Sequence, residues 1–295
     1  MTARIIDVSP DDYHRLPGFS ASLAKVLISR SPLHARDAMD RGLEEEAAEE
    51  DEEDDEAKQK RLDTGSILHT LLLGKGKRFK VLPYDAWRTK AAKDDRDAAR
   101  AAGLIPIKEK EMEVYQRMAA AMRSRIELAG HTLDGESEVA IGWTEPTPSG
   151  PVECRCMLDH LVAWGLDGSC QPGAIIFELK PVADASPARC ERTAENLGYG
   201  IATAAYTRAL TALYPQLAGR IEFRFLWPEF KRPYALHDPV PDGMFRELGE
   251  QRWLRAVHTW GACLARGEYP GYKAHKEISA PMWALKQEGF TQEDV

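Results

Sequence analysis

Two carboxylates and a lysine stand close together in the sequence segment 150–180. Asp159 comes first, and Glu178 and Lys180 follow near the end of the segment with a single leucine between them. Carboxylate oxygens bind hard divalent cations such as Mg²⁺, and an ammonium group beside them can orient a water molecule or offset the charge that develops on phosphorus. These residue types therefore predict metal-dependent hydrolysis of a phosphodiester.

The spacing of these three residues is degenerate, and many chains of this length contain a similar pattern by chance. A Glu-x-Lys pair at the end of a surface hairpin is also ordinary. The context of Glu178 and Lys180 strengthens the catalytic interpretation, because the pair closes an apolar run at 175–180. A charge next to buried residues is costly unless it has a partner or a metal.

A β-hairpin is the element that must position these residues. The segment 175–180 is apolar, begins with β-branched residues, follows a Pro-Gly turn signal and ends at a proline, which predicts a short buried strand. Side chains alternate between the two faces of a strand, so Glu178 and Lys180 share one face. The first arm of the hairpin, 152–164, has the same period and places on one face Arg155, Met157 and Asp159.

The composition describes a protein that can bury a substantial core. Its 295 residues suit one large α/β domain. No apolar run is as long as a membrane span, and the first residues lack the pattern of a signal peptide, so we expect a cytoplasmic protein with no membrane partner. The five cysteines are odd in number and form no C-x-x-C pair, which argues against a disulfide framework and against a zinc or iron–sulfur site.

The acidic residues are unevenly distributed. The formal net charge is −8, but the segment 44–56 (EEEAAEEDEEDDE) holds eleven acidic residues and no basic one. The remaining 36 acidic residues stand against 39 lysines and arginines, so the body of the protein is nearly neutral and permits DNA binding without requiring it. Because the acidic segment is too charged to pack, we expect a disordered insertion at 43–60 within a single domain, 1–295.

Periodicity and turn signals place the other elements. Helices are expected at 21–28, 32–41, 64–73, 108–129, 194–213 and 242–266. Strands are expected at 79–82, 138–143 and 221–227, with a weaker one at 233–236. Between 88 and 100, basic residues recur at helical spacing, and they could follow a phosphate backbone or simply be solvated among the aspartates of the same segment: Lys90, Lys93, Arg96 and Arg100.

Two further residues are candidate metal ligands. His69 lies in an otherwise apolar stripe of the expected helix 64–73. A lone histidine in such a stripe is more often a hydrogen-bonded core residue, but a neutral imidazole is also a common metal ligand. Glu138 lies at the start of the expected strand 138–143 and is either an additional ligand or an exposed strand end.

Several short segments occur in an order that resembles one nuclease family. They are YHRLPGFSASLAKVLISRSP, TGSILHTLLL, SEVAIGW, CRCMLDHL, IIFELK and LGYGIATAAY. The order is similar to that of the RecE-like (exodeoxyribonuclease VIII-type) PDDEXK nuclease domain, in the RecB and lambda-exonuclease-like branch, and spans about residues 13–272. The resemblance implies an α/β fold with a restriction-endonuclease-like core, in which helices flank a mixed central sheet and the site lies at one sheet edge.

The resemblance also implies roles for the residues of the candidate site. His69, Asp159 and Glu178 match metal ligands of the family, and Glu138 matches a glutamate that lies ahead of the hairpin in related nucleases. Lys180 matches the catalytic lysine, which acts together with the two hairpin carboxylates. These residues would hold one or two Mg²⁺ (or Mn²⁺) ions. The family's usual Asp-x-Lys-Thr is here Glu-x-Lys-Pro.

A later helix carries the expected DNA contacts. Tyr206 matches the tyrosine of a Gln-x-x-x-Tyr motif, and Ala202 occupies the position of the glutamine. Tyr199 falls on the same face of the expected helix. We expect DNA to be contacted by Tyr206 and Tyr199, and also by Arg155, which shares a strand face with Asp159.

The implied function is that of a metal-dependent DNA exonuclease, which would resect double-stranded DNA ends in phage-type or prophage-type recombination. Its expected partners are DNA and a single-strand annealing protein, and it could assemble as a homo-oligomer. The alternative, which Ala202 favours, is a DNA-binding module with weak or no catalysis. A third alternative is a phage structural or interaction protein with a chance hairpin, in which His69, Asp159 and Glu178 would lie far apart.

Overall fold

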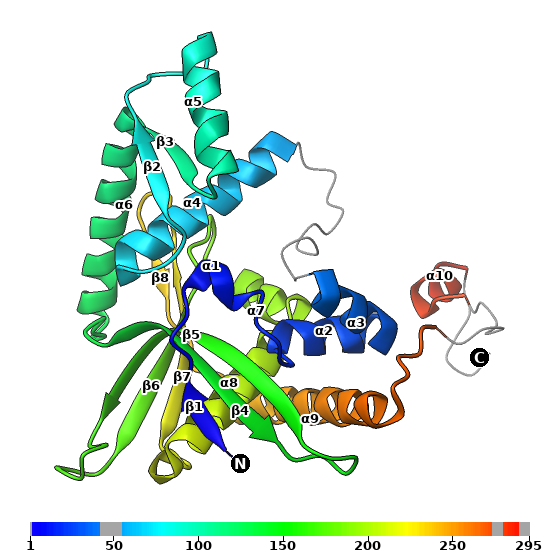
Figure 1. The fold of residues 1–295 in the computed structure, drawn as a ribbon. Coiled ribbons are helices and arrows are strands. Elements are labelled where there is room, and N and C mark those ends of the chain that lie inside the picture. The colour runs from blue at the N-terminus through cyan, green and yellow to red at the C-terminus, as the bar shows by residue number, and fades with distance from the viewer. Residues whose placement is uncertain (1, 42–54, 273–279, 289–295) are drawn as a thin grey trace.

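A six-stranded sheet forms the centre of the protein in a computed structural model, which describes residues 2–41, 55–272 and 280–288. The strand order is β1 (Ala3–Ile5), β4 (Glu136–Glu145), β5 (Val152–Trp164), β6 (Gly173–Leu179), β7 (Ile221–Pro228) and β8 (Leu236–His237). Neighbouring strands of this sheet are antiparallel except for β6 and β7, which run parallel. Figure 1 shows helices on both faces, which confirms a mixed sheet flanked by helices.

One face of the sheet is covered by a group of helices that contribute to the largest core. The helices are α2 (Ala21–Ser29), α3 (Pro32–Arg41), α7 (Pro187–Asn196), α8 (Tyr199–Leu213) and α9 (Gly243–Arg266). Large aromatic residues fill the space between these helices and the strands, including the fully buried Trp143 and Trp253. The N-cap Ser20 accepts the N–H of Leu23, which fixes the start of α2.

The opposite face is covered by two long helices, α4 (Asp55–Leu73) and α6 (Glu109–Leu128). Leu68 and Leu72 of α4 and Met122 of α6 pack against Phe177 and Leu179 of β6 in a second core. Phe177 and Leu179 thus face α4, and the alternation of β6 directs Glu178 and Lys180 away from this core.

A smaller layer projects beyond α4 and α6 (Figure 1). It consists of the parallel pair β2 (Phe79–Leu82) and β3 (Ile105–Lys108), together with α5 (Lys90–Ala101). Ile105 and Ile107 of β3 and Ile67 of α4 form its buried centre. The short elements α1 (Pro10–Tyr13), η2 (Pro215–Leu217) and α10 (Met282–Gln287) complete the fold.

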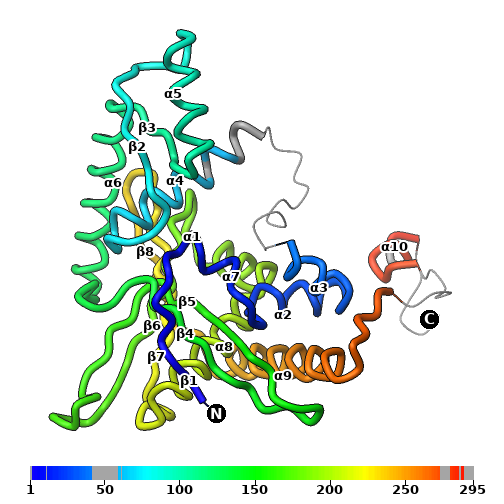
Figure 2. Tube along the Cα trace, viewed as in Figure 1, coloured from blue at the N-terminus to red at the C-terminus, as the bar shows by residue number. Residues whose placement is uncertain are grey.

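The N-terminal segment crosses the sheet before it reaches α2, along the blue trace of Figure 2. β1 pairs with β4, where Ile5 lies opposite Ile141. Further along, the N–H of Phe19 donates to the carbonyl of Glu153, and the N–H of Arg155 donates to the carbonyl of Phe19. The segment therefore reaches β5 on the strand that carries Asp159.

Several expected boundaries differ from the structure. The weaker strand expected at 233–236 is the two-residue β8, and the strand expected at 138–143 is the longer β4. α4 begins at Asp55 and not near residue 64, so residues 55–60 of the expected disordered insertion are helical, while residues 43–54 lie outside the described residues. The expected helix 194–213 is two helices, because Gly198 adopts the left-handed conformation (φ 65°) and breaks the chain direction between α7 and α8. None of the described helices is both long and apolar enough to cross a membrane.

Candidate active site

The candidate site lies where β5 and β6 separate. Their ladder runs from Trp164 opposite Gly173 to His160 opposite Phe177. Beyond that pair, the N–H of Leu179 donates to the side chain of Asp159 (2.9 Å) instead of to the backbone of β5. β6 meanwhile continues beside β7. The two strands diverge at the residues that carry the carboxylates.

The position of this opening corrects one expectation from the family resemblance. β5 and β6 are interior strands with neighbours on both sides, so the site does not lie at a lateral edge of the sheet. It lies at the end of the β5–β6 ladder. Divergence of two adjacent strands leaves room for side chains between them, and this is the space that Asp159 and Glu178 occupy.

Glu138 of β4 adopts a positive φ of 55°, and the alternation of side chains changes phase at this residue. In a regular strand, Ser137 and Val139 would share a face. Here Ser137 donates to the carbonyl of Leu73 in α4, whereas Val139 belongs to the core on the opposite face. The pairs Ser137–His160 and Val139–Leu158 flank Glu138 in the register of β4 and β5. The irregular backbone thus brings Glu138 toward the opening.

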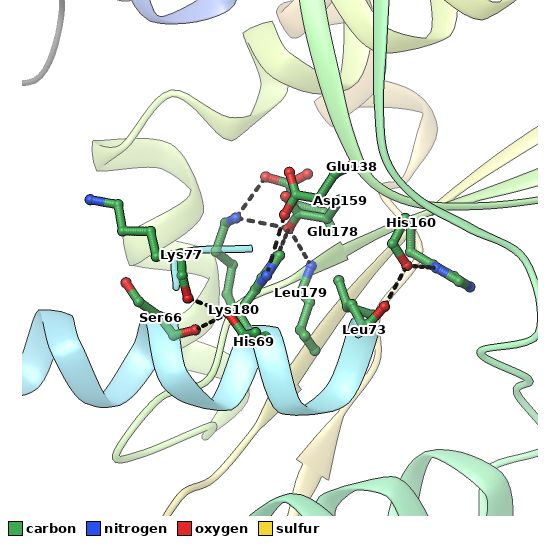
Figure 3. A network of polar contacts seen from close by, with 12 residues as sticks. Ser66, His69, Leu73, Lys77, Glu138, Asp159, His160, Glu178, Leu179 and Lys180 are labelled. Atoms are coloured by element: carbon green, nitrogen blue, oxygen red, sulfur yellow. Dashed lines mark hydrogen bonds and ion pairs between the residues drawn. The ribbon is translucent and has the colours of Figure 1, made fainter. Parts of the chain in front are cut away.

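Five side chains converge in the opening (Figure 3). The two ring nitrogens of His69 contact different carboxylates: Nδ1 lies 3.5 Å from Glu138 Oε1, and Nε2 lies 3.5 Å from Asp159 Oδ2. Lys180 Nζ lies 3.2 Å from Asp159 Oδ2 and 2.9 Å from Glu178 Oε1. All the expected metal and catalytic residues are therefore brought together, from α4, β4, β5 and β6 and the residue that follows β6.

Burial and mutual repulsion keep two of the carboxyl groups partly protonated. Burial raises the pKa of Glu178 to about 7, and the charge of Asp159 adds to this rise. Burial also raises the pKa of Glu138 to about 6. Burial would raise the pKa of Asp159 as well, but Lys180 and His69 together hold it far below its ordinary value. Asp159 is thus the anionic centre of the group.

The two cationic side chains respond to the same field. Burial opposes the charge of Lys180, but Asp159 and Glu178 outweigh it and raise the lysine pKa well above its ordinary value. Burial likewise opposes the charge of His69. The hydrogen bond to Asp159 and the negative charges of Asp159 and Glu138 outweigh burial and raise the pKa of His69. Lys180 is therefore an ammonium ion at neutral pH.

The chain matches no protein-family model, and no curated protein matches it. Among solved structures, that of a proposed exonuclease from Eubacterium rectale is similar over 96% of this chain and 99% of the other, with a TM-score of 0.51 and 12% sequence identity. The two chains share a fold. The mixed α/β architecture is therefore confirmed, and the RecE-like and PDDEXK assignments stay predictions.

The donor set of the opening suits a hard divalent cation. Glu178 Oε2 is buried and has no hydrogen-bond partner among the described residues. An unpartnered buried carboxylate oxygen is costly, and a cation would compensate it. Oxygen donors with one imidazole fit Mg²⁺ or Mn²⁺. Within the described residues no three His, Cys, Asp or Glu side chains are already arranged as a metal centre, and Lys180 Nζ lies between the carboxylates instead.

Arg155 occupies a place that does not suit direct contact with DNA. It is 3% exposed, and its guanidinium donates to the backbone carbonyls of Tyr13 (3.0 Å) and His14 (3.3 Å). The guanidinium also lies over the ring of Tyr13. These contacts engage the buried guanidinium of Arg155, so this residue anchors the N-terminal segment to β5. This corrects the expectation that the residue faces DNA.

Tyr199 and Tyr206 lie on α8, on the side of the sheet toward which Glu178 and Lys180 point. The ring of Tyr199 stacks on Phe225 of β7, with 5.7 Å between centroids. Burial raises the pKa of both tyrosines, and Glu178 contributes to both shifts. Both tyrosines therefore lie within the electrostatic field of the carboxylates, and their contact with DNA stays a prediction.

The loop that follows α4 was not singled out from the sequence. Gly76 packs so closely that a Cβ on it would lie 3.3 Å from Nδ1 of His69. The signal that could have identified the loop is its alternation of glycine and lysine (GKGKRFK) directly after the helix that carries His69.

Proposed function

We propose that the protein is a metal-dependent deoxyribonuclease that hydrolyses phosphodiester bonds of DNA from its ends. The observation that carries the proposal is the convergence of His69, Glu138, Asp159, Glu178 and Lys180 where β5 and β6 diverge. The fold shared with a proposed exonuclease supports it at the level of architecture. End resection in phage-type recombination, an annealing protein as partner and a homo-oligomer belong to the same proposal.

His69, Asp159 and Glu178 would hold a Mg²⁺ or Mn²⁺ ion, with Glu138 as an additional ligand. Such an ion supplies a Lewis acid that lowers the pKa of a bound water and polarises a phosphoryl oxygen. Oε2 of Glu178 is buried without a hydrogen-bond partner among the described residues, so a cation bound there would compensate it.

Lys180 acts as a cation and not as a base. Its raised pKa keeps the ammonium protonated at neutral pH, so it cannot accept a proton from water. It can donate hydrogen bonds to the attacking water or to the phosphate, and it offsets the negative charge that develops in the transition state. In the metal-free site, the pKa values of Glu178, about 7, and Glu138, about 6, both lie near neutral pH. Glu138 is the additional and not a principal ligand, so it is the carboxyl group that can carry a proton while Glu178 holds the ion.

A cleavage assay on two matched substrates tests the proposal. The purified protein is incubated with linear duplex DNA or with the same sequence as a covalently closed circle, in Mg²⁺, in Mn²⁺ or in EDTA. Degradation of the linear form alone, and only with a divalent cation, is the expected result. Cleavage of the circle would change the assignment to an endonuclease, and the absence of cleavage with either metal would remove the nuclease proposal.

The alternative function is a DNA-binding module that has lost efficient catalysis. Ala202 favours it, because its methyl group on α8 offers no hydrogen bond where the family carries a glutamine. The same assay separates the two functions when binding is measured beside cleavage. Ala202→Gln would then raise the cleavage rate of a weak enzyme and leave an inactive binding module unchanged.

A further inference from the structure

A basic segment, here called the basic loop, follows α4, enters the first residues of β2 and lies beside the candidate site. It spans residues 74–80, contains no acidic residue, and carries four exposed basic residues: Lys75, Lys77, Arg78 and Lys80. The carboxylates of the opening would repel the phosphates of a nucleic acid, so a compensating positive surface is needed nearby.

The structure holds the basic loop against the turn of α4 that carries His69. The hydroxyl of Thr70, the residue next to His69, donates to the carbonyl of Lys77 at 3.0 Å. Gly76 has a φ of 139°, and a Cβ there would lie 2.6 Å from Thr70 Oγ1 and 3.3 Å from His69 Nδ1. Only glycine allows this close approach at this φ. The position of the loop is thus tied to the position of the candidate metal ligand.

The charges of the basic loop extend from the site outward. Burial raises the pKa of Glu138, whereas the positive charge of Lys75 lowers it. The charge of Lys75 therefore acts on a carboxyl group of the opening. The side chain of Lys77, in contrast, points away from the carboxylates in Figure 3, while its carbonyl faces α4. Lys80 lies further on, in β2. A chain-like ligand bound along these residues would therefore extend from the opening past the end of α4.

We infer that the basic loop binds backbone phosphates of the DNA strand next to the bond held at the site. The inference rests on the proposed function, since it takes DNA as the substrate. A series of cations fits a polyanion better than a single phosphate, because each lysine can neutralise a successive backbone charge. The contact is to the backbone, so it positions the strand without reading its sequence.

A triple substitution tests the inference. Lys75→Ala, Lys77→Ala and Lys80→Ala are combined, and Arg78 is retained. The control combines Arg246→Ala, Arg255→Ala and Arg266→Ala, which removes the same charge from exposed positions of α9 on the other side of the sheet. Affinity for linear duplex DNA is measured in EDTA at several salt concentrations, with melting curves to verify folding.

The loop variant is expected to bind DNA about ten- to a hundredfold more weakly than the control at low salt, and the slope of log affinity against log salt should become shallower by about 2 to 3. Replacement of the same three lysines by arginine should retain the affinity and the slope. In Mg²⁺, the loss should appear mainly in KM, because none of the three lysines is placed among the catalytic groups.

The outcomes separate this inference from the proposed function. If the wild-type protein cleaves DNA, and the loop variant equals the control in affinity and slope, the inference is overturned while the nuclease stands. If the wild-type protein binds but does not cleave, a selective loss of binding in the loop variant supports the inference and removes the nuclease. A wild-type protein that binds no DNA overturns both, and loss of affinity in the arginine variant would overturn the assignment to charge.

Discussion

Nε2 of His69 in α4 lies 3.5 Å from Oδ2 of Asp159 in β5. This contact joins the helix on one face of the sheet to the strand at which the ladder opens. The other ring nitrogen contacts Glu138, so a single imidazole spans two carboxylates from neighbouring strands. Any change that moves α4 relative to the sheet therefore alters the site as a whole.

Lys180→Ala should abolish cleavage and leave DNA binding intact. The ammonium lies 2.9 Å from Glu178 and 3.2 Å from Asp159, and it is placed to stabilise charge that develops in the transition state. Removal of one such group typically lowers kcat about 10²- to 10³-fold. Gel-based cleavage and binding assays measure both effects, with Lys110→Ala at an exposed position of α6 as the control. A fully active Lys180→Ala protein would contradict the catalytic role.

Asp159→Ala should weaken the binding of Mn²⁺. Asp159 is the carboxylate with the lowest pKa of the site, and it contacts both His69 and Lys180. Titration calorimetry of the two proteins measures the loss of affinity directly. Asp94→Ala, an exposed change of the same kind on α5, serves as control and should bind Mn²⁺ as the wild type does. Equal affinity in Asp159→Ala and Asp94→Ala would exclude Asp159 as a ligand.

The sequence was sufficient to predict part of the site. Strand alternation placed Glu178 and Lys180 on one face, and the ion pair between these two residues agrees with that expectation. The contact between His69 and Asp159 was implied only by the family resemblance. No local rule connects a residue of an early helix with a strand that comes much later, because the contact depends on how α4 packs across β6.

The irregular features of the site could not be predicted. Glu138 was expected at the start of a strand, yet it lies within β4 with a positive φ, a conformation that a glutamate seldom adopts. Arg155 was expected to face DNA because alternation placed it with Asp159. The N-terminal segment covers Arg155, and strand alternation carries no information about which distant segment packs on a residue.

Long periodic elements were predicted better than short ones. The helix expected at 242–266 is α9, and the hairpin arms are β5 and β6. β1 was not expected, because three residues are too few to show alternation, and β3 was not expected, because it contains Pro106, which weighs against a strand. The break at Gly198 was missed because the alanine-rich residues around it favour a continuous helix.

The metal-free protein should become less stable as the pH rises from 5 to 8. The pKa of Glu178 is about 7 in the folded state against an ordinary value of 4.5, so between these values the folded state holds a proton that the unfolded state has released. Stability therefore falls with rising pH, by about 1.4 kcal/mol per unit of pKa difference and by a few kcal/mol at most. The raised pKa values of Glu138 and His69 act in the same direction.

Urea unfolding in EDTA at pH 5 and pH 8 measures this loss. Glu178→Gln should reduce the pH dependence, since the amide does not titrate. Glu113→Gln, at an exposed position of α6, should keep the wild-type dependence. An unchanged difference between the two pH values in Glu178→Gln would contradict the buried, proton-holding state of this residue.

Gly76→Ala should impair activity more than Gly74→Ala. Both glycines have positive φ, so alanine strains the backbone at either position, at a cost of about 1–2 kcal/mol. At Gly74 a Cβ would meet open space, whereas at Gly76 it would press on Thr70 and His69. Melting curves and cleavage rates of the two variants isolate the steric effect on His69. Equal rates would show that the approach of the loop does not set the position of the imidazole.

The strongest effect on stability is expected at Arg208. Its guanidinium binds Glu145, which is fully buried and also accepts the indole N–H of Trp143 at 3.1 Å. Arg208→Ala would leave the buried carboxylate without its cation, at a cost of about 3–5 kcal/mol. Arg252 forms the same kind of bidentate ion pair with Glu195, but the side chain of Glu195 is half exposed.

Arg252→Ala is therefore the matched control for Arg208→Ala, with an expected loss below about 1 kcal/mol, because exposed ion pairs are screened by water. Chemical denaturation of both variants at pH 7 gives the two free energies of unfolding. The pKa of Glu145 is lowered in the folded state, since Arg208 outweighs burial. The wild-type advantage should therefore shrink as the pH falls through that lowered pKa and the carboxylate becomes protonated. Equal losses in the two variants would mean that Glu145 finds another partner when Arg208 is removed.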